Sequence, residues 1–307
     1  LLQATLDCYP YSINHWNSLG KCYLSTNDYE EAHEAIDFAL AIDDSNAEAL
    51  TLKAFCYQQS GELQKSCDYY LRLAEQQENK TRAYLALAKT YFEMQDYTSS
   101  IYYIEALLDN KDALSKYELS ELYGDIALCH AALKHIGVGQ ASIRRSLELN
   151  ENDPDTLIVA GRFFLMEAKA CNDETAKAEN QAKGELYFRQ ALNLIMEDER
   201  LDYLFTIGAA CFDTQNFKLA AQYYEQINRE FPDNAPATYF FLAYCYFYLE
   251  EAISCMHYIA KMKHELPDAY SNLGTSDSIL SDTRFNELMR NLKDSVNNGK
   301  VDLDNFL

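Results

Sequence analysis

The chain has 307 residues, of which 48% are hydrophobic, and it contains 24 tyrosines and 15 phenylalanines. Its 48 acidic and 26 basic side chains give a net charge of −22, which argues against a nucleic acid partner. Ten glycines and five prolines are too few for a disordered chain or a turn-rich β fold. The longest charge-free apolar run, residues 235–249, is too short to cross a membrane.

A sequence pattern with a regular period begins near the N-terminus. The stretch HWNSLGKCYLSTNDYEEA contains Trp16, Leu19, Gly20, Tyr23 and Ala32 at regular intervals. The positions of Trp16, Tyr23 and Ala32 recur without gaps in the next two blocks, as Leu50, Tyr57 and Ser66, and then as Tyr84, Tyr91 and Ser100. A recurrence at this spacing, about 34 residues, indicates an array of helical repeats.

The pattern resembles the tetratricopeptide repeat, a helix–turn–helix unit of about 34 residues with the motif W-x2-L-G-x2-Y in its first helix. The second-helix positions of the family fall here on Ala32, Ile36 and Ala39. The resemblance implies an all-α fold, a right-handed solenoid of helix–turn–helix units with a C-terminal capping helix. In such a fold small residues such as Gly20 and Gly208 stand where paired helices come closest.

This register predicts seven repeats within residues 13–266. They start near residues 13, 47, 81, 120, 154, 201 and 236. Residues 1–12 resemble the second helix of a truncated preceding repeat, and upstream repeats or a targeting segment are then missing.

Two segments depart from the regular repeat. An insertion near residues 165–183 predicts that both helices of the fifth repeat are one or two turns longer, with Asn172 or Asp173 as the cap. Residues 267–307 predict a capping helix that starts after Asp282 and ends in a loose tail from Asn297. The buried face of this helix consists of Phe285, Leu288, Met289 and Leu292.

The sequence offers no pattern for catalysis or for a metal or cofactor, so we expect a non-enzymatic chain with none of these. The six histidines lack ligands at metal spacing, and no phosphate-binding loop or hydrolase motif occurs. Cysteines share one repeat position in four repeats, and we expect buried thiols there: Cys22, Cys56, Cys129 and Cys245. Scattered unpaired cysteines favour a reducing compartment, the cytoplasm.

The resemblance also implies a binding groove, because repeat positions 2, 5, 9 and 12 of the first helices line the concave surface in this family. In the front half these positions are largely polar: Asn14, Asn17, Lys21, Arg82, Lys89, Phe92 and Arg162. In the back half they are aromatic: Phe205, Phe212, Phe240, Tyr244 and Phe247. These aromatics either form an exposed platform for a partner or are covered by the final helix or a tight superhelix.

The favoured function is therefore a scaffold or adaptor that binds an unidentified protein or peptide segment in this groove, without a nucleic acid or membrane partner. The alternative is a regulatory or sensor array of a larger enzyme or transcription regulator whose other domain lies upstream. Self-association is a further option. A chaperone-tail clamp is a minor one, because Asn17, Lys21, Leu85 and Lys89 match its Lys–Asn and Lys–Arg pattern poorly.

Overall fold

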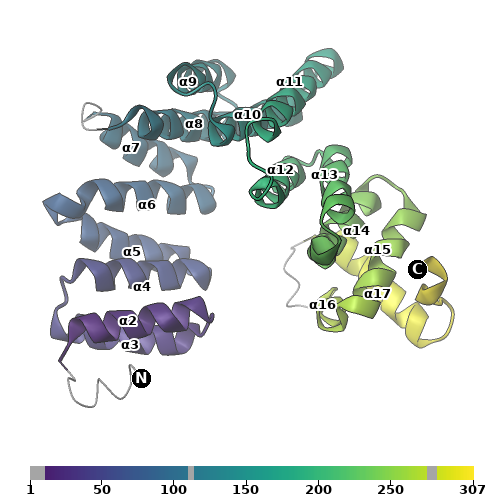
Figure 1. Cartoon of the computed structure of the whole chain (residues 1–307), viewed down its shortest axis with the longest axis horizontal. Coiled ribbons are helices and arrows are strands. Elements are labelled where there is room, and N and C mark those ends of the chain that lie inside the picture. Colours follow the sequence, from purple (N-terminus) through teal and green to yellow (C-terminus); the bar gives the residue numbers. More distant parts are fainter. Residues whose placement is uncertain (1–10, 110–113, 275–281) are drawn as a thin grey trace. The chain divides into compact units, whose positions relative to one another are not determined.

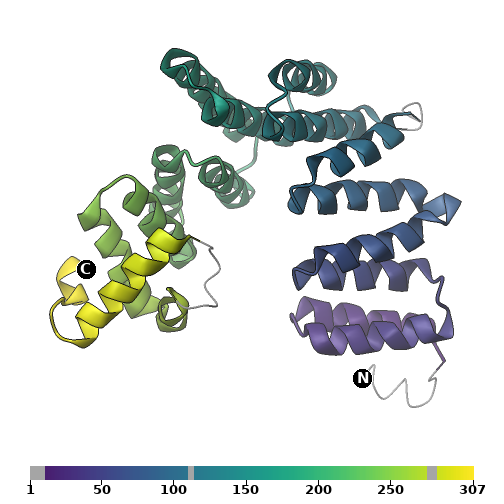
Figure 2. The same cartoon turned by 180° about the vertical axis from the view of Figure 1, so that it is seen from behind.

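The computed structural model describes residues 11–109, 114–274 and 282–307, and its regular secondary structure is helical throughout these residues (Figures 1 and 2). The predicted all-α fold of paired, stacked helices is confirmed. The chain divides into two compact units, Leu1–Asn150 (unit 1) and Glu151–Leu307 (unit 2). The expected helix of a preceding repeat lies mostly in residues 1–10, outside the described residues.

Unit 1 contains four successive helix pairs, which stack in chain order (Figure 1). Their bounds are α2 Ile13–Ser25 and α3 Tyr29–Ile42, α4 Ala47–Gln59 and α5 Leu63–Ala74, α6 Lys80–Glu93 and α7 Tyr97–Leu108, and α8 Lys116–Ala132 and α9 Ile136–Leu149. A short 3₁₀ turn, Gln77–Asn79, precedes α6.

Within its described residues, unit 2 contains three further helix pairs and four additional elements. Its pairs are α10 Pro154–Ala170 and α11 Glu174–Leu192, α12 Arg200–Asp213 and α13 Phe217–Glu230, and α14 Tyr239–Tyr248 and α15 Ala252–Glu265. The remaining elements are the 3₁₀ helix Pro232–Thr238, then α16 Pro267–Asn272, α17 Thr283–Asn297 and the 3₁₀ turn Leu303–Phe306.

The turn inside most helix pairs is made by one residue in the left-handed backbone region. Its φ is +62° at Asn27, +79° at Gly61 and +62° at Gln95, the first residues of the recurring turns in the sequence. The next amide closes the turn, as when the Asp28 N–H donates to the Tyr23 carbonyl at 2.9 Å. The left-handed residue lets the chain reverse its direction, and this hydrogen bond satisfies a carbonyl that the ending helix leaves free.

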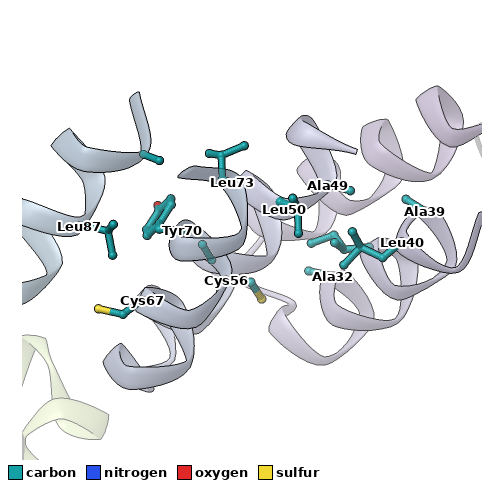
Figure 3. Close-up of a cluster of buried hydrophobic side chains, with 13 residues drawn as sticks. Ala32, Ala39, Leu40, Ala49, Leu50, Cys56, Cys67, Tyr70, Leu73 and Leu87 are labelled. Atoms are coloured by element: carbon teal, nitrogen blue, oxygen red, sulfur yellow. The ribbon is translucent and has the colours of Figure 1, made fainter. Parts of the chain in front are cut away.

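The core of unit 1 lies between consecutive helices and is built from small and large side chains in alternation. Figure 3 shows Ala32, Ala39 and Ala49 of α3 and α4 near Leu50, with Tyr70, Leu73 and Leu87 further along the same cluster, and all of these are at most 6% exposed. Hydrophobic burial of this kind is the main favourable term in folding. Each pair therefore depends on its neighbours for a complete core.

Glycines stand at the closest approach between the two helices of three pairs. A Cβ atom at Gly20 would lie 2.8 Å from Ile36 Cγ1, and one at Gly208 would lie 2.8 Å from Tyr224 Cε1. At Gly161 the gap to Phe188 Cε1 is only 2.4 Å. Since real Cβ contacts are longer than this, a larger residue forces the helices or the facing ring to move.

The insertion in the fifth repeat forms two long helices, as predicted. Helix α10 has 17 residues and α11 has 19, against 14 each in α12 and α13. Asp173 caps α11 by accepting a hydrogen bond from the Ala176 N–H at 3.0 Å. Ring contacts continue along the pair, since Phe164 stacks on Tyr187 at 5.6 Å.

Three expectations about local structure are wrong. Pro236 lies in a 3₁₀ helix, so that the first α-helix of its pair begins only at Tyr239. The tail after Asn297 is not loose throughout, because Leu303 is fully buried and His257 Nδ1 lies 2.7 Å from the Phe306 carbonyl oxygen. Cys22 is exposed, whereas Cys56, Cys129 and Cys245 are buried as expected.

Candidate protein-interaction surfaces

The first helices of the first three repeats present an exposed residue at one shared repeat position. Lys21 on α2, Phe55 on α4 and Lys89 on α6 stand one repeat apart from each other and occupy the same repeat position. All three are exposed, Phe55 by 41%. Arg82 is also exposed on α6, two turns before Lys89. We call Lys21, Phe55, Arg82 and Lys89 the front row.

Glu48 provides the counter-charge at one end of the front row. Its carboxylate accepts a hydrogen bond from the Lys21 ammonium and another, at 3.0 Å, from the Asn17 amide. The contact with Lys21 is the main reason why the pKa of Glu48 is lowered from its ordinary value of 4.5. Burial opposes the shift, and Asn17 and Arg82 add to it.

Asn17 is buried and links two helices rather than lining an open groove. It is only 1% exposed, and its amide also donates to Asn46 Oδ1 at 3.1 Å. Asn46 in turn caps α4 by accepting from the Ala49 N–H at 3.0 Å. Asn17 therefore ties α2 to the start of α4, and the expectation that it lines an open groove is corrected.

Replacing Glu48 by Gln should lower the free energy of unfolding by less than about 1 kcal/mol at pH 7, because the ion pair with Lys21 is solvent-exposed. A carboxylate with a lowered folded-state pKa stabilises the fold above its unfolded pKa, and this stabilisation is lost as pH falls through the folded pKa. The difference between the two proteins should thus shrink in urea titrations as pH falls below about 4.5. A difference that does not depend on pH in this range, or an equal effect of Glu121→Gln on α8, would contradict this assignment.

The aromatic residues of α14 are covered by α17. Phe285 of α17 is 1% exposed, and its ring lies 6.1 Å from Phe240, 5.1 Å from Tyr244 and 5.5 Å from Phe247. Tyr244 is only 9% exposed, while Phe240 and Phe247 are half-buried. Of the two alternatives for these aromatics, cover by the final helix holds for Tyr244, because α17 fills the space in front of it.

The other predicted groove residues differ from one another in their exposure and in the side chains that they contact. In unit 1, Asn14 is exposed, and half-buried Phe92 packs edge-on against Tyr97 at 5.4 Å. In unit 2, Arg162 lies 3.5 Å from Asp213. Phe205 and Phe212 are half-buried within aromatic clusters that include Tyr224, Phe217, Phe241 and Tyr244. The predicted residues thus belong to two separate surfaces, one in each unit.

Phe55 is the residue that the sequence interpretation missed. Its position could have been found from the repeat, since it stands midway between Lys21 and Lys89 at the same register. Two pockets of about 360 and 480 Å³ on either side of α13 were also not anticipated. Their linings mix acidic and basic side chains, among them Glu185, Arg189, Lys218 and Glu225, so that they favour no single ligand charge.

The described residues contain no group of three or more His, Cys, Asp or Glu side chains that could hold a metal ion. Within the same residues, no helix combines the length and the apolar character that a membrane span requires.

Residues 17–80 and 81–112 match family models of the tetratricopeptide repeat. The chain therefore contains tetratricopeptide repeats, as the sequence pattern predicted. Proteins built from these repeats are generally non-enzymatic scaffolds, and the repeats support a general role in protein–protein interaction. A search of curated protein sequences finds no match.

Solved structures with similar folds include PilW, described as a widely conserved type IV pilus biogenesis factor. It has a TM-score of 0.50 and 17% identity, covering 72% of this chain and 94% of PilW. PilF from Pseudomonas aeruginosa has a TM-score of 0.47 and 18% identity, covering 72% of this chain and 92% of PilF. A chain of the Cut9–Hcn1 hetero-tetramer of the APC/C has a TM-score of 0.45 and 14% identity, covering 94% of this chain and 44% of that one. At these identities the likeness concerns the fold.

Proposed function

We propose that the chain is a non-enzymatic adaptor and that the front row of unit 1 captures an extended or helical segment of a partner protein. The observation that carries this proposal is the exposed row itself, with an aromatic ring at Phe55 between cations at Lys21 and Lys89. Exposed aromatic side chains and arginines are enriched where protein surfaces meet partners, and complementary charges help to orient a bound segment.

The charge of the front row supports a partner segment with acidic groups. In a chain of net charge −22, three of the 26 basic residues gather on this row. Lys21, Phe55 and Lys89 occupy one repeat position in three successive repeats, so that the row presents a cation, a ring and a cation in this order. An acidic segment with one apolar anchor matches this order, with the anchor on Phe55 and carboxylates near Lys21, Arg82 and Lys89.

The test is affinity capture with the wild type and with Phe55→Ala and Lys89→Glu variants, followed by titration of the partner that the wild type retains. Each variant should weaken binding by about fivefold or more, equivalent to at least about 1 kcal/mol. The loss for Lys89→Glu should shrink at high salt, because exposed charges are screened. Lys116→Glu on α8 makes the same charge change in the same unit and is the matched control. Equal binding by all variants, at an unchanged melting temperature, would overturn the proposal.

A further inference from the structure

In unit 2 the aromatic face of α14 contacts α17 in two ways, through the Phe285 ring and through the carboxylate of Asp282. We call Phe240, Tyr244, Phe247 and Tyr248 the aromatic site. The first three surround the Phe285 ring of α17, which is 1% exposed. Phe285 is thus an inserted anchor of the kind that dominates helix-in-groove recognition.

Asp282, the residue before α17, uses its two carboxylate oxygens for different purposes. Oδ1 accepts hydrogen bonds from the backbone N–H groups of Arg284, at 2.9 Å, and Phe285, at 3.2 Å, and so caps the helix. Oδ2 accepts hydrogen bonds from the hydroxyls of Tyr244, at 2.5 Å, and Tyr248. Hydroxyl donors to a carboxylate make charge-assisted bonds, which are about twice as strong as neutral ones.

This double use couples docking to helix formation. The carboxylate meets both tyrosine hydroxyls while it caps, and the cap places the aromatic residue three positions later over the aromatic site. An acidic residue that no helix follows would not place an aromatic anchor such as Phe285 over the site. A helix with a neutral N-cap would not offer a carboxylate to the two tyrosine hydroxyls. The site therefore selects a helix that begins with an acidic cap and continues with an aromatic residue.

The remaining contacts of α17 show which of its parts the site recognises. The Arg284 guanidinium lies over the rings of Phe247 at 5.9 Å and Tyr248 at 5.6 Å, so the residue after the cap adds a cation–π contact. Further along α17, Lys293 donates to the backbone carbonyls of Ser271 and Leu273 rather than to α14. Recognition by the aromatic site is thus concentrated in the first turn of α17.

We propose that the aromatic site is a docking site for an amphipathic helix of a partner protein with the pattern acidic–x–x–aromatic at its N-terminus, and that α17 occupies the site as an internal competitor. The two tyrosine hydroxyls, which donate to the N-cap carboxylate, identify the partner's chemistry. The inference extends the proposed adaptor function to a second surface, in the other unit.

The probe is a fluorescent peptide of residues 282–297, added to the full chain and followed by anisotropy. We expect weak binding to the wild type, because α17 competes at the high effective concentration of a tethered ligand. A chain with Asp282→Ala and Phe285→Ala should bind the same peptide at least about tenfold more tightly, since its own α17 no longer competes. Asp282→Asn, which keeps a capping side chain without its charge, is the milder variant and should give an intermediate affinity.

Matched changes test the recognition pattern itself. Phe285→Ala in the peptide should weaken binding by about thirtyfold or more, as for other buried aromatic anchors. Tyr248→Phe in the chain keeps the ring that stacks on Phe217 at 4.9 Å and removes one hydroxyl, so it should weaken binding by about tenfold. Glu287→Gln in the peptide changes an exposed residue and should leave binding unchanged.

Three results would overturn the inference. The first is equal binding of the native and Phe285→Ala peptides, and the second is equal binding of the native peptide to the wild type and to the released variant. The third is a wild-type dimer that disappears on Phe285→Ala, because the occupant is then a second copy of the chain. None of these results bears on the front row, whose test uses residues of unit 1 and a different ligand.

Discussion

Gly161→Ala should lower the free energy of unfolding by about 1–2 kcal/mol, and Gly161→Leu by considerably more. The added Cβ lies 2.4 Å from Phe188 Cε1, and Phe188 is fully buried, so its ring has no free space into which to move. Overpacking of this kind costs roughly 1–3 kcal/mol, while alanine regains up to about 1 kcal/mol of helix propensity. The clash is the larger effect, and denaturant titration of both variants measures the difference.

Gly137→Ala in α9 is the matched control for this prediction. Gly137 is also helical, but a Cβ there meets no atom within 4 Å, so only the gain in helix propensity remains. This variant should therefore be as stable as the wild type or more stable by up to about 1 kcal/mol. If Gly161→Ala behaves like Gly137→Ala, the close approach of α10 and α11 is not what requires glycine.

The positions of these glycines show what the sequence could predict. Gly20 and Gly208 were assigned to close helix contacts from the repeat register, and the structure places both against large side chains of the second helix. A regular repeat period fixes which positions face the partner helix, because each pair repeats the same geometry. The same register predicted the fold class, and the insertion that interrupts it predicted the long helices of the fifth repeat.

Cys22 and Tyr244 show why the register could not predict exposure everywhere. Cys22 occupies the same repeat position as Cys56, whose thiol is buried and donates to the Tyr29 carbonyl oxygen of the preceding pair at 3.6 Å. No described helix pair precedes α2, so Cys22 lacks this cover. Tyr244 stands at a groove position, but a helix 38 residues further along fills the space before it. Contacts from outside the repeat therefore determine whether Cys22 and Tyr244 are exposed.

The last large effect concerns Lys53, a charged residue at a core position of α4. It is 2% exposed, and its ammonium lies 2.6 Å from Asp37 Oδ1 and 3.2 Å from the His33 carbonyl oxygen. The equivalent residues of the neighbouring repeats are Leu19 and Leu87. The fold therefore accommodates an apolar side chain at this position, and in the second repeat it carries a buried lysine paired with an exposed aspartate instead.

Asp37→Asn should lower the free energy of unfolding by about 1–2 kcal/mol, since it removes the counter-charge of the buried Lys53 ammonium, while the 60% exposure of Asp37 lets solvent screen part of the loss. Lys53→Met should be neutral or stabilising by up to about 2 kcal/mol, because an apolar side chain of similar length carries no desolvation penalty. The double variant should match Lys53→Met alone, since Asp37 affects stability mainly through Lys53. Urea titration of the three variants measures the coupling free energy between Asp37 and Lys53. If the two single changes in free energy of unfolding simply add up in the double variant, Asp37 does not act through Lys53.

The pKa of His33 is an independent measure of the Lys53 charge. Burial lowers the pKa of His33 below its ordinary value of 6.5, and the Lys53 ammonium lowers it further. A histidine with a lowered folded-state pKa takes up its proton more readily when unfolded, so the fold loses stability as pH falls below about 6.5. Lys53→Met should therefore raise the pKa of His33 in an NMR titration and reduce this loss of stability below about pH 6.5. An unchanged pKa of His33 would mean that the Lys53 charge is screened at this position, and the expected cost of Asp37→Asn would then fall to that of a surface ion pair, below about 1 kcal/mol.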